Sequence, residues 1–460
     1  MRLFFFQSIE IPLTMHSKLF LFSFFFIVLS SQQLFSQTLS KVITYYDDST
    51  QFMKKEVFFI KDGDTSQIEG TFKKYYENGD LLAEGIFTEG KEEGIFEMYY
   101  PDGKLMRTTA YDAGKRDGKT IVFDIDGDTL QQASFRKDTL EGKLSLYYPD
   151  GQLKSESSFL NGKPEGKVID YFKDGTIAQE IMYAGGKPNG ETKRYYPNGQ
   201  AKTIENYTNG ELNGDFTTFY NNGQVETIFQ NAGGKKAGEF KNYNRNGALL
   251  LRGYYKEGKL EGENISYHPD GQIKTQRTYK GGFLSGEVLT YDTSSVLIKK
   301  LVYSDRQTKK ERYTYSEEGV LLSEAFFEQE KPIDTWKYFF HDGSLKIVEN
   351  YSNGLLHGEH LTYFPKGQLA ESITYQGGKK TGVETFYFES GQIQSTQIYK
   401  FGKKQGEYKA YHPNGIIAVA GEYSGSKKVK EWPYYDNKAK LLKTEVYANN
   451  QLVDTILPSE

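Results

Sequence analysis

A glycine returns every 24 residues through most of this chain. The series runs from Gly70 to Gly286 and, after two positions without glycine, from Gly358 to Gly406, and no insertion shifts its register. Such a period is typical of a stack of copies of one small unit. Each copy contacts its neighbours, and there is no single compact core.

Three apolar columns share this period. The column that begins at Tyr75 is aromatic in all sixteen copies, the column from Leu81 is mostly aliphatic, and the column from Phe87 is aromatic except at Asn231. We expect the first column to form a structural ladder. Its tyrosines include Tyr75, Tyr99, Tyr147, Tyr171, Tyr195, Tyr243, Tyr267, Tyr363, Tyr387 and Tyr411.

A second glycine column predicts the turn. This glycine follows Asp or Asn in most copies, and in six copies a proline precedes them. Because proline fixes φ near about −65°, the motif excludes a type I′ turn and favours a type I turn with a left-handed glycine bulge. The resulting three-residue loop places Tyr147 opposite Leu153 across two antiparallel strands. Since alternate residues share a face, Phe159 is expected on the same face as both.

The predicted fold class is all-β. Two strands per copy give an elongated open array of stacked antiparallel β-hairpins with about 32 strands. A cross-strand pair contributes about 0.2–1 kcal/mol, and a lone hairpin is marginally stable. Stability is therefore expected to come from stacking, which turns the three columns into three continuous apolar stripes.

The unit resembles the MORN repeat in its bacterial variant form. The resemblance rests on Gly190–Gly199 (GETKRYYPNG), Gly406–Gly415 (GEYKAYHPNG) and Trp336–Gly343 (WKYFFHDG), and it covers residues 70–453. It implies an elongated, twisted and grooved sheet of hairpins. It also implies scaffolding or attachment as the function, with membrane-lipid binding proposed for some family members.

The N-terminus resembles a secretory signal peptide over residues 1–36, with the true start expected at Met15. A basic start at Lys18 precedes the twelve-residue stretch Leu19–Ser30, almost all apolar, which is short for a membrane span. A retained signal anchor is the alternative. The chain has no cysteine, so we expect no disulfide and no lipoprotein anchor. The mature protein is expected in the periplasm, on the outer surface or outside the cell, with no transmembrane segment.

The remaining boundaries follow the repeat. Residues 37–69 are expected to form a degenerate N-terminal cap, residues 70–453 the array, and residues 454–460 a tail. The glycine pattern is degenerate near 286–334, which predicts a bend or seam within the array.

The motifs that could carry chemistry fall on repeat positions. Asp124–Asp128 has acidic residues suited to calcium, His357–His360 has two histidines, and Gly377–Gly382 has a phosphate-loop composition. Each lacks the spacing or the helix that its site needs. We therefore expect no enzyme activity, no catalytic or metal-binding residues and no cofactor. The net charge of −4 gives no indication of nucleic-acid binding.

A lysine column defines the candidate binding rim. It follows the second turn of the repeat and comprises Lys91, Lys115, Lys163, Lys187, Lys235, Lys259, Lys331, Lys379, Lys403 and Lys427. The opposite edge is expected to carry the turn acids Asp102, Asp126, Asp150, Asp174, Asp270 and Asp342. Two interpretations stay open. The lysines are either solvated turn residues, or a ladder for an anionic polymer, a lipid surface or a second copy of the chain.

The sequence thus predicts an exported, non-enzymatic scaffold for protein–protein interaction in the cell envelope or at the surface. The alternative is a module that binds glycans or anionic lipids through the tyrosine stripe and the lysine rim. Self-association through the sheet edges is a further expectation, because an open edge strand can pair with another chain.

Overall fold

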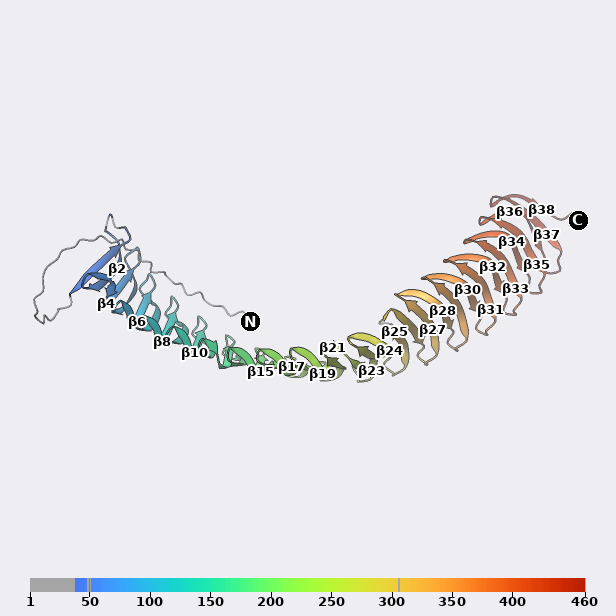
Figure 1. The fold of residues 1–460 in the computed structure, drawn as a ribbon. Helices are drawn as coiled ribbons and strands as arrows, with labels where there is room; N and C mark the ends of the chain where they lie inside the picture. The colour runs from blue at the N-terminus through green and yellow to red at the C-terminus, as the bar shows by residue number, and fades with distance from the viewer. Residues whose placement is uncertain (1–37, 48, 50, 305–306, 460) are drawn as a thin grey trace, which may run out of the picture.

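The computed structural model describes residues 38–47, 49, 51–304 and 307–459. The predicted signal peptide and Met15 lie outside these residues. The described chain is all-β, a single open antiparallel sheet of 38 strands, as the repeat predicts. Figure 1 shows one long bowed ribbon of stacked hairpins, with the first strands of the sheet at one end and the last strands at the other. No helix within the described residues has the length and apolar character needed to cross a membrane.

The strands follow one another without crossovers. The first half of the sheet consists of β1 (Leu39–Tyr45), β2 (Lys54–Lys61), β3 (Asp64–Ile68), β4 (Gly70–Tyr75), β5 (Leu81–Thr88), β6 (Lys91–Tyr99), β7 (Leu105–Asp112), β8 (Lys115–Phe123), β9 (Thr129–Arg136), β10 (Thr139–Tyr147), β11 (Leu153–Leu160), β12 (Lys163–Pro164), β13 (Gly166–Tyr171), β14 (Ile177–Ala184), β15 (Lys187–Tyr195), β16 (Ala201–Thr208), β17 (Glu211–Phe219), β18 (Val225–Ala232) and β19 (Lys235–Tyr243). The second half consists of β20 (Leu249–Lys256), β21 (Lys259–Leu260), β22 (Gly262–Tyr267), β23 (Ile273–Lys280), β24 (Phe283–Tyr291), β25 (Leu297–Ser304), β26 (Lys309–Tyr315), β27 (Leu321–Glu328), β28 (Lys331–Phe339), β29 (Leu345–Ser352), β30 (Leu355–Tyr363), β31 (Leu369–Gln376), β32 (Lys379–Tyr387), β33 (Ile393–Lys400), β34 (Lys403–Tyr411), β35 (Ile417–Ser424), β36 (Lys427–Tyr435), β37 (Leu441–Ala448) and β38 (Gln451–Ile456).

The first turn of each repeat has the predicted geometry. In the loop after β10, the N–H of Gly151 donates to the carbonyl of Tyr148 at 2.9 Å, and the N–H of Tyr148 donates to Gln152 at 2.8 Å. Gly151 has φ +80°, and Tyr147 pairs with Leu153. The Pro-Asp-Gly motif is therefore the three-residue loop with a left-handed glycine that the sequence predicts.

The second turn of the repeat is a two-residue loop, except between β25 and β26, where Ser304 pairs with Lys309. After β11, Leu160 pairs with Lys163, and Asn161 and Gly162 between them have φ of +52° and +73°. Positive φ at both central residues identifies a type I′ turn, which matches the twist of the strands it joins.

The predicted single apolar face is wrong. Next to the first turn the register shifts by one residue, between Leu146 and Tyr147 in β10, and this bulge interrupts the alternation of side chains. In β14, Glu180 and Tyr183 are three residues apart and so point to opposite faces. The hydroxyl of Tyr195 donates to Glu180 at 3.0 Å, so the Tyr75 column and the Phe87 column lie on opposite faces of the sheet.

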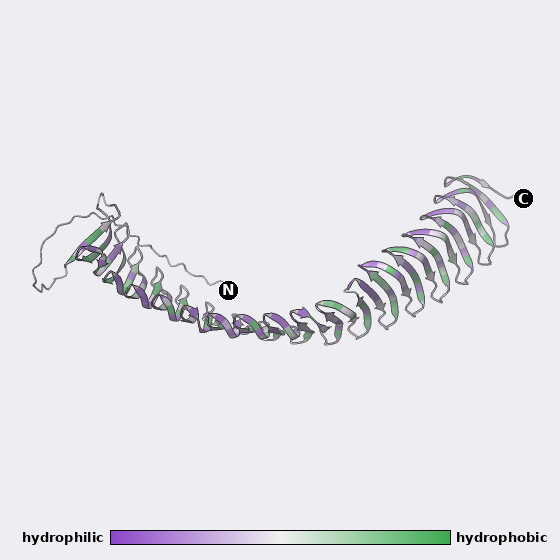
Figure 2. Cartoon of the chain, in the orientation of Figure 1, coloured by the Kyte–Doolittle hydropathy of each residue, from purple (hydrophilic) through white to green (hydrophobic). Residues whose placement is uncertain are grey.

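We name the two faces by their side chains. The aromatic face carries the columns that begin at Phe72, Gly85 and Phe87 and recur every 24 residues. The ion-pair face carries the columns from Lys73, Tyr75 and Glu84, with cross-strand pairs such as Lys73–Glu84 at 2.9 Å. Figure 2 shows hydrophobic and hydrophilic residues interleaved along the strands, as expected for a sheet with two unlike faces.

The core is thin because the sheet is a single layer. Among the described residues, Trp432 and Thr192 are the largest side chains that are less than 2% exposed. At the N-terminal end, β1–β3 extend the same sheet, and Phe58 and Ile60 pack with Phe72 and Phe87 of the first repeat. The packing that stabilises each hairpin is thus supplied by its immediate neighbours.

Near the predicted seam the sheet stays continuous. The pairing of β25 with β26 has no register shift, in contrast to the equivalent pairing of β23 with β24. The column glycine is absent at Lys310, and the bulge that a left-handed residue would make is absent with it. At Asp334, where glycine is also absent, φ is +57° and the bulge is retained.

Replacing Gly199 with valine should destabilise the protein by at least about 1 kcal/mol, since a β-branched residue fits φ > 0 poorly. Gly199 has φ +80°, and a Cβ there would meet nothing within 4 Å, so the cost would come from the backbone alone. Urea unfolding measures it. Gly199→Asn is the matched control and should cost less, because asparagine tolerates this conformation. Equal stability of the valine variant and the native chain would contradict the turn assignment.

Candidate functional site

The aromatic face forms a continuous series of rings. At the N-terminal end, ring centroids lie 5.3 Å apart for Phe72 and Phe87, 5.5 Å for Phe87 and Phe96, and 5.3 Å for Phe96 and Tyr111. Contacts of this kind join the column from Phe72 to the column from Phe87. All members of the second column except Phe87 and Asn231 are half-buried, so their rings are within reach of a ligand.

Side-chain size is matched across neighbouring strands of this face. A Cβ added at Gly85 would lie 2.5 Å from the ring of Phe96, and one added at Gly421 would lie 2.2 Å from Trp432. Trp336 similarly follows the small Ala325 by eleven residues. The rings of Phe96, Trp336 and Trp432 thus follow members of the Gly85 column with little or no side chain, whereas Phe216, Phe240 and Tyr408 follow large residues.

The predicted tyrosine ladder lies on the ion-pair face. Tyr99 donates to Glu97 at 2.6 Å and is 3.0 Å from Glu84, and Tyr195 donates to Glu180. Burial, with a smaller contribution from the hydrogen bond to Glu180, raises the pKa of Tyr195 to about 12. Tyr99 and Tyr195 are therefore neutral hydrogen-bond donors to the carboxylates of their own sheet.

A second tyrosine column links consecutive repeats. The hydroxyl of Tyr148 donates to the carbonyl of Tyr171 in the next repeat at 2.8 Å, and Tyr196 does the same to Phe219. His268 and His412 occupy this column in other repeats, with ring nitrogens 3.0 and 2.9 Å from the matching carbonyls. Sequence reasoning missed this role, although the Tyr-Tyr doublets of the repeat contain its signal.

A column of mostly glutamate side chains also links consecutive repeats, by accepting backbone hydrogen bonds at the second turn. The side chain of Glu141 accepts the N–H of Asn161 at 2.8 Å, and that of Glu165 accepts the N–H of Gly185 at 2.7 Å. Each acceptor immediately precedes the column glycine and binds the turn that follows it in the array. This contact was also missed, and its sequence signal is the recurrent Glu-Gly pair.

The candidate binding rim lies where the sequence places it. Each of its ten lysines is the first residue of a strand, directly after the second turn, and each is exposed. Within the described part of the chain, none of them makes an ion pair. A Cβ added at Gly186 would lie 3.3 Å from Cβ of Lys163, so the lysine stems lie against the turn of the following repeat.

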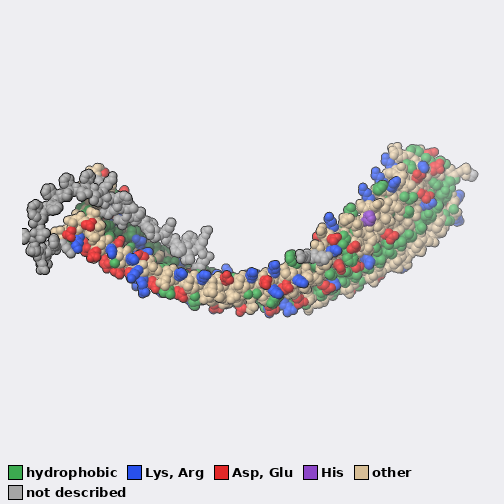
Figure 3. All heavy atoms as spheres, in the orientation of Figure 1, with side chains coloured by type: hydrophobic (Ala, Val, Ile, Leu, Met, Phe, Trp, Pro, Cys, Tyr) green, Lys and Arg blue, Asp and Glu red, His purple; other side chains and the backbone are tan. Residues whose placement is uncertain are grey.

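The rim is not basic along its whole length. The column of carboxylates described above lies on the same edge, and the six turn residues from Thr88 to Glu93 include three acidic residues and one lysine. The corresponding segments 376–381, 400–405 and 424–429 have no acidic residue. Figure 3 shows Lys and Arg side chains in a row along one edge of the C-terminal part of the molecule. These three consecutive repeats therefore carry positive charge without acidic residues at this turn, as does the segment 232–237 with Lys235 and Lys236.

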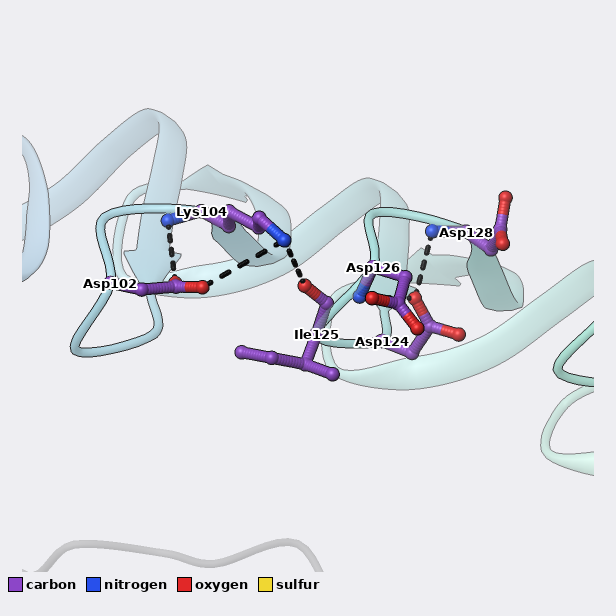
Figure 4. A network of polar contacts seen from close by, with 6 residues as sticks. All are labelled: Asp102, Lys104, Asp124, Ile125, Asp126 and Asp128. Atoms are coloured by element: carbon purple, nitrogen blue, oxygen red, sulfur yellow. Dashed lines mark hydrogen bonds and ion pairs between the residues drawn. The ribbon is translucent and has the colours of Figure 1, made fainter.

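The acidic loop at Asp124 serves its own turn. The carboxylate of Asp124 accepts the backbone N–H groups of Asp126 and Asp128, both at 2.9 Å (Figure 4). In the same view Lys104 donates to the carbonyl of Ile125 at 2.9 Å. No group of three or more His, Asp or Glu side chains in the described residues is placed to hold a metal ion.

The histidines near 357–360 have different surroundings. His357 lies at the second turn, whereas Nε2 of His360 is 3.5 Å from Glu349 and its ring centroid is 5.7 Å from that of Tyr375. The hydrogen bond from His360, assisted by Tyr351, lowers the pKa of Glu349. His360 is thus one of the aromatic-face residues that have a carboxylate partner.

Comparison with known protein families finds the MORN repeat variant in eight segments. The matched residues are 68–89, 92–113, 140–161, 188–209, 260–280, 356–376, 380–401 and 404–424. No curated protein sequence matches the chain.

The solved structures add little to this. A crystal structure of TcdB2-TccC3-Cdc42 is 12% identical over 89% of this chain and 30% of that chain, with a TM-score of 0.12. A structure of the Photorhabdus luminescens Tc holotoxin pore is 11% identical over 88% of this chain and 27% of that chain, again with a TM-score of 0.12. The chain spans less than a third of these structures, and likenesses at this TM-score carry no argument.

Proposed function

We propose that this protein, which carries MORN repeat variants in eight segments, is an exported, non-enzymatic scaffold that binds a partner protein along the aromatic face. One observation supports this most strongly. The described strands form a single layer, so no second sheet or helix of the described chain packs on a face lined with half-buried rings. Tyrosine and tryptophan supply large contact areas at low entropic cost, which suits a binding surface.

Export is part of the same proposal. It rests on the apolar stretch Leu19–Ser30 and on the small residue Ser36, which suits a cleavage site. We place the mature protein in the periplasm, on the outer surface or outside the cell. Mass spectrometry of the mature N-terminus should find Gln37 as the first residue.

Photo-crosslinking from the two faces tests the scaffold proposal. Tyr183 and Met182 are adjacent in β14 and point to opposite faces. Two variants, one with benzoylphenylalanine at position 183 and one with it at position 182, therefore form a matched pair. In the native host, we expect a discrete crosslinked protein from position 183 and none from position 182. Equal crosslinking from both positions, or crosslinking from 182 alone, would contradict binding at the aromatic face.

A second candidate function is binding of a glycan or an anionic lipid by the C-terminal part of the rim. The observation that favours it is the run of lysines without acidic neighbours or ion pairs, next to Phe401, which is 69% exposed. These lysines are Lys379, Lys400, Lys403, Lys404, Lys427 and Lys428.

Binding to vesicles and to an acidic polysaccharide tests this candidate. Changing Lys403, Lys404 and Lys427 together to glutamine should abolish salt-sensitive binding. The same number of changes at Lys91, Lys115 and Lys163 should leave it unchanged, since carboxylates flank those lysines. Binding that is lost equally in both triple variants would exclude a C-terminal site.

We also propose that a second copy of the chain is a partner and that the two copies associate through the sheet edge. Strand β38 pairs with β37 alone in the described sheet, and all six of its residues are exposed. Leu452 and Val453 are 53% and 59% exposed. An apolar edge strand of this kind is a template for pairing with a second copy.

A further inference from the structure

A cavity of about 350 Å³ opens on the aromatic face between β18 and β23. Its walls include the rings of Phe229, Phe240, Tyr255 and Tyr279. Ligand pockets in proteins range from about 300 to 1,000 Å³, so this cavity suits a ligand with a single ring.

Two cations line the cavity without an acidic partner. Nζ of Lys236 lies 4.7 Å from the ring centroid of Phe229 and 5.3 Å from that of Tyr255. Arg277 lies on the adjoining wall. No Asp or Glu is among the residues that line the cavity, and within the described chain neither cation makes an ion pair.

Some other cations of the same face are paired. Arg194 forms an ion pair with Glu205, and Nζ of Lys380 is 3.6 Å from Glu371 in addition to its contact with Glu384. Lys404 and Lys428 also lie beside rings of this face and make no ion pair within the described residues, but Lys236 and Arg277 are the two such cations that adjoin this cavity. Arg277 is half-buried, and partly desolvated charge without a counter-charge is costly, so a bound anion would remove that cost.

Asn264 provides a third group for an anion. Its side chain is 3% exposed, and its Nδ2 has no hydrogen-bond partner. Asn264 pairs directly with Arg277 across β22 and β23, so the two side chains are neighbours on one face. The absence of a side chain at Gly253 makes room for the amide, because a Cβ there would lie 1.7 Å from Oδ1 of Asn264. A buried unpaired donor is rare in proteins and marks a place for an acceptor.

We propose that this cavity binds a carboxylate attached by a short arm to an aromatic ring. Arg277 and the amide of Asn264 would donate to the carboxylate oxygens, with Lys236 supplying the second positive charge. The ring of the ligand would pack against Phe229 and Phe240. The proposal stands independently of the scaffold function, since it needs no partner protein.

Titration of the full chain with 3-phenylpropionate, followed by ligand-observed NMR, tests the site. We expect the carboxylate to bind at least about tenfold more tightly than the neutral 3-phenylpropanamide. Lys236→Gln and Arg277→Gln should each weaken binding about tenfold. The matched controls Lys241→Gln and Arg252→Gln, which remove charge from the ion-pair face of β19 and β20, should leave it unchanged.

Equal affinity for the acid and the amide would overturn the proposal, as would equal losses in the site variants and the controls. Lys236 is exposed, so its variant should fold normally, and an unchanged circular dichroism spectrum checks this. A short peptide ending in phenylalanine distinguishes two sources of the same chemistry. Tighter binding of the peptide by tenfold or more would identify the end of a partner chain, and equal or weaker binding would identify a free aromatic acid.

Discussion

Replacing Trp432 with alanine should lower the free energy of unfolding of the C-terminal repeats by about 3–5 kcal/mol. The side chain is 1% exposed, and its ring centroid lies within 5.1–6.1 Å of those of Tyr408, Tyr423 and Tyr447. Its indole N–H donates to the carbonyl of Val429 at 3.1 Å. Truncation would therefore leave a cavity and an unpaired carbonyl between two neighbouring hairpins.

The damage should stay local, because each hairpin contacts only its neighbours. Hydrogen exchange should show loss of protection around β34–β38 and unchanged protection in β4–β11. The control Phe401→Ala removes a ring that is 69% exposed and should cost under about 0.5 kcal/mol. If Trp432→Ala instead unfolds the whole chain in one step, the described sheet has a shared core and is not a stack of independent units.

The hairpins and their first turn could be predicted because their signals are local. The Pro-Asp-Gly motif restricts φ at consecutive residues, and this restriction alone sets the loop length and the pairing of Tyr147 with Leu153. The repeat period then extends one hairpin to the whole array. No long-range contact has to be inferred for either step.

The distribution of side chains between the faces could not be read in the same way. The bulge beside the turn changes the alternation of faces, and counting by two across it assigns Phe159 to the wrong side. The Phe72 column was missed for a second reason. It varies from phenylalanine to threonine, asparagine and tryptophan, and its size depends on neighbouring strands, as the fit of Trp432 to Gly421 shows.

The candidate sites differ in the same way, since one depends on a local sequence signal and the other on contacts between strands. The lysine rim was predicted because turn residues keep their place in every repeat. The net positive charge of the C-terminal part of the rim was not predicted, because it depends on the absence of acidic residues at the same turns. The cavity at Lys236, Asn264 and Arg277 was not predicted, since these residues belong to three different columns. Only the faces of the folded sheet bring them together and separate them from nearby carboxylates.

The fit between Gly421 and Trp432 predicts a strong coupling of two substitutions. Gly421 does not have positive φ, so a larger side chain there acts through steric overlap alone. A Cβ would lie 2.2 Å from Cδ2 of Trp432, and Gly421→Leu should displace the indole at a cost of about 3 kcal/mol. In a chain that already carries Trp432→Ala, the leucine would occupy the space that the indole left and should cost little. The double-mutant cycle, measured by urea unfolding with circular dichroism, should therefore give a coupling energy of about 2–3 kcal/mol.

Additive costs would show that the two positions do not share one packing site. The compensation between the Gly85 and Phe72 columns would then be a coincidence of the sequence.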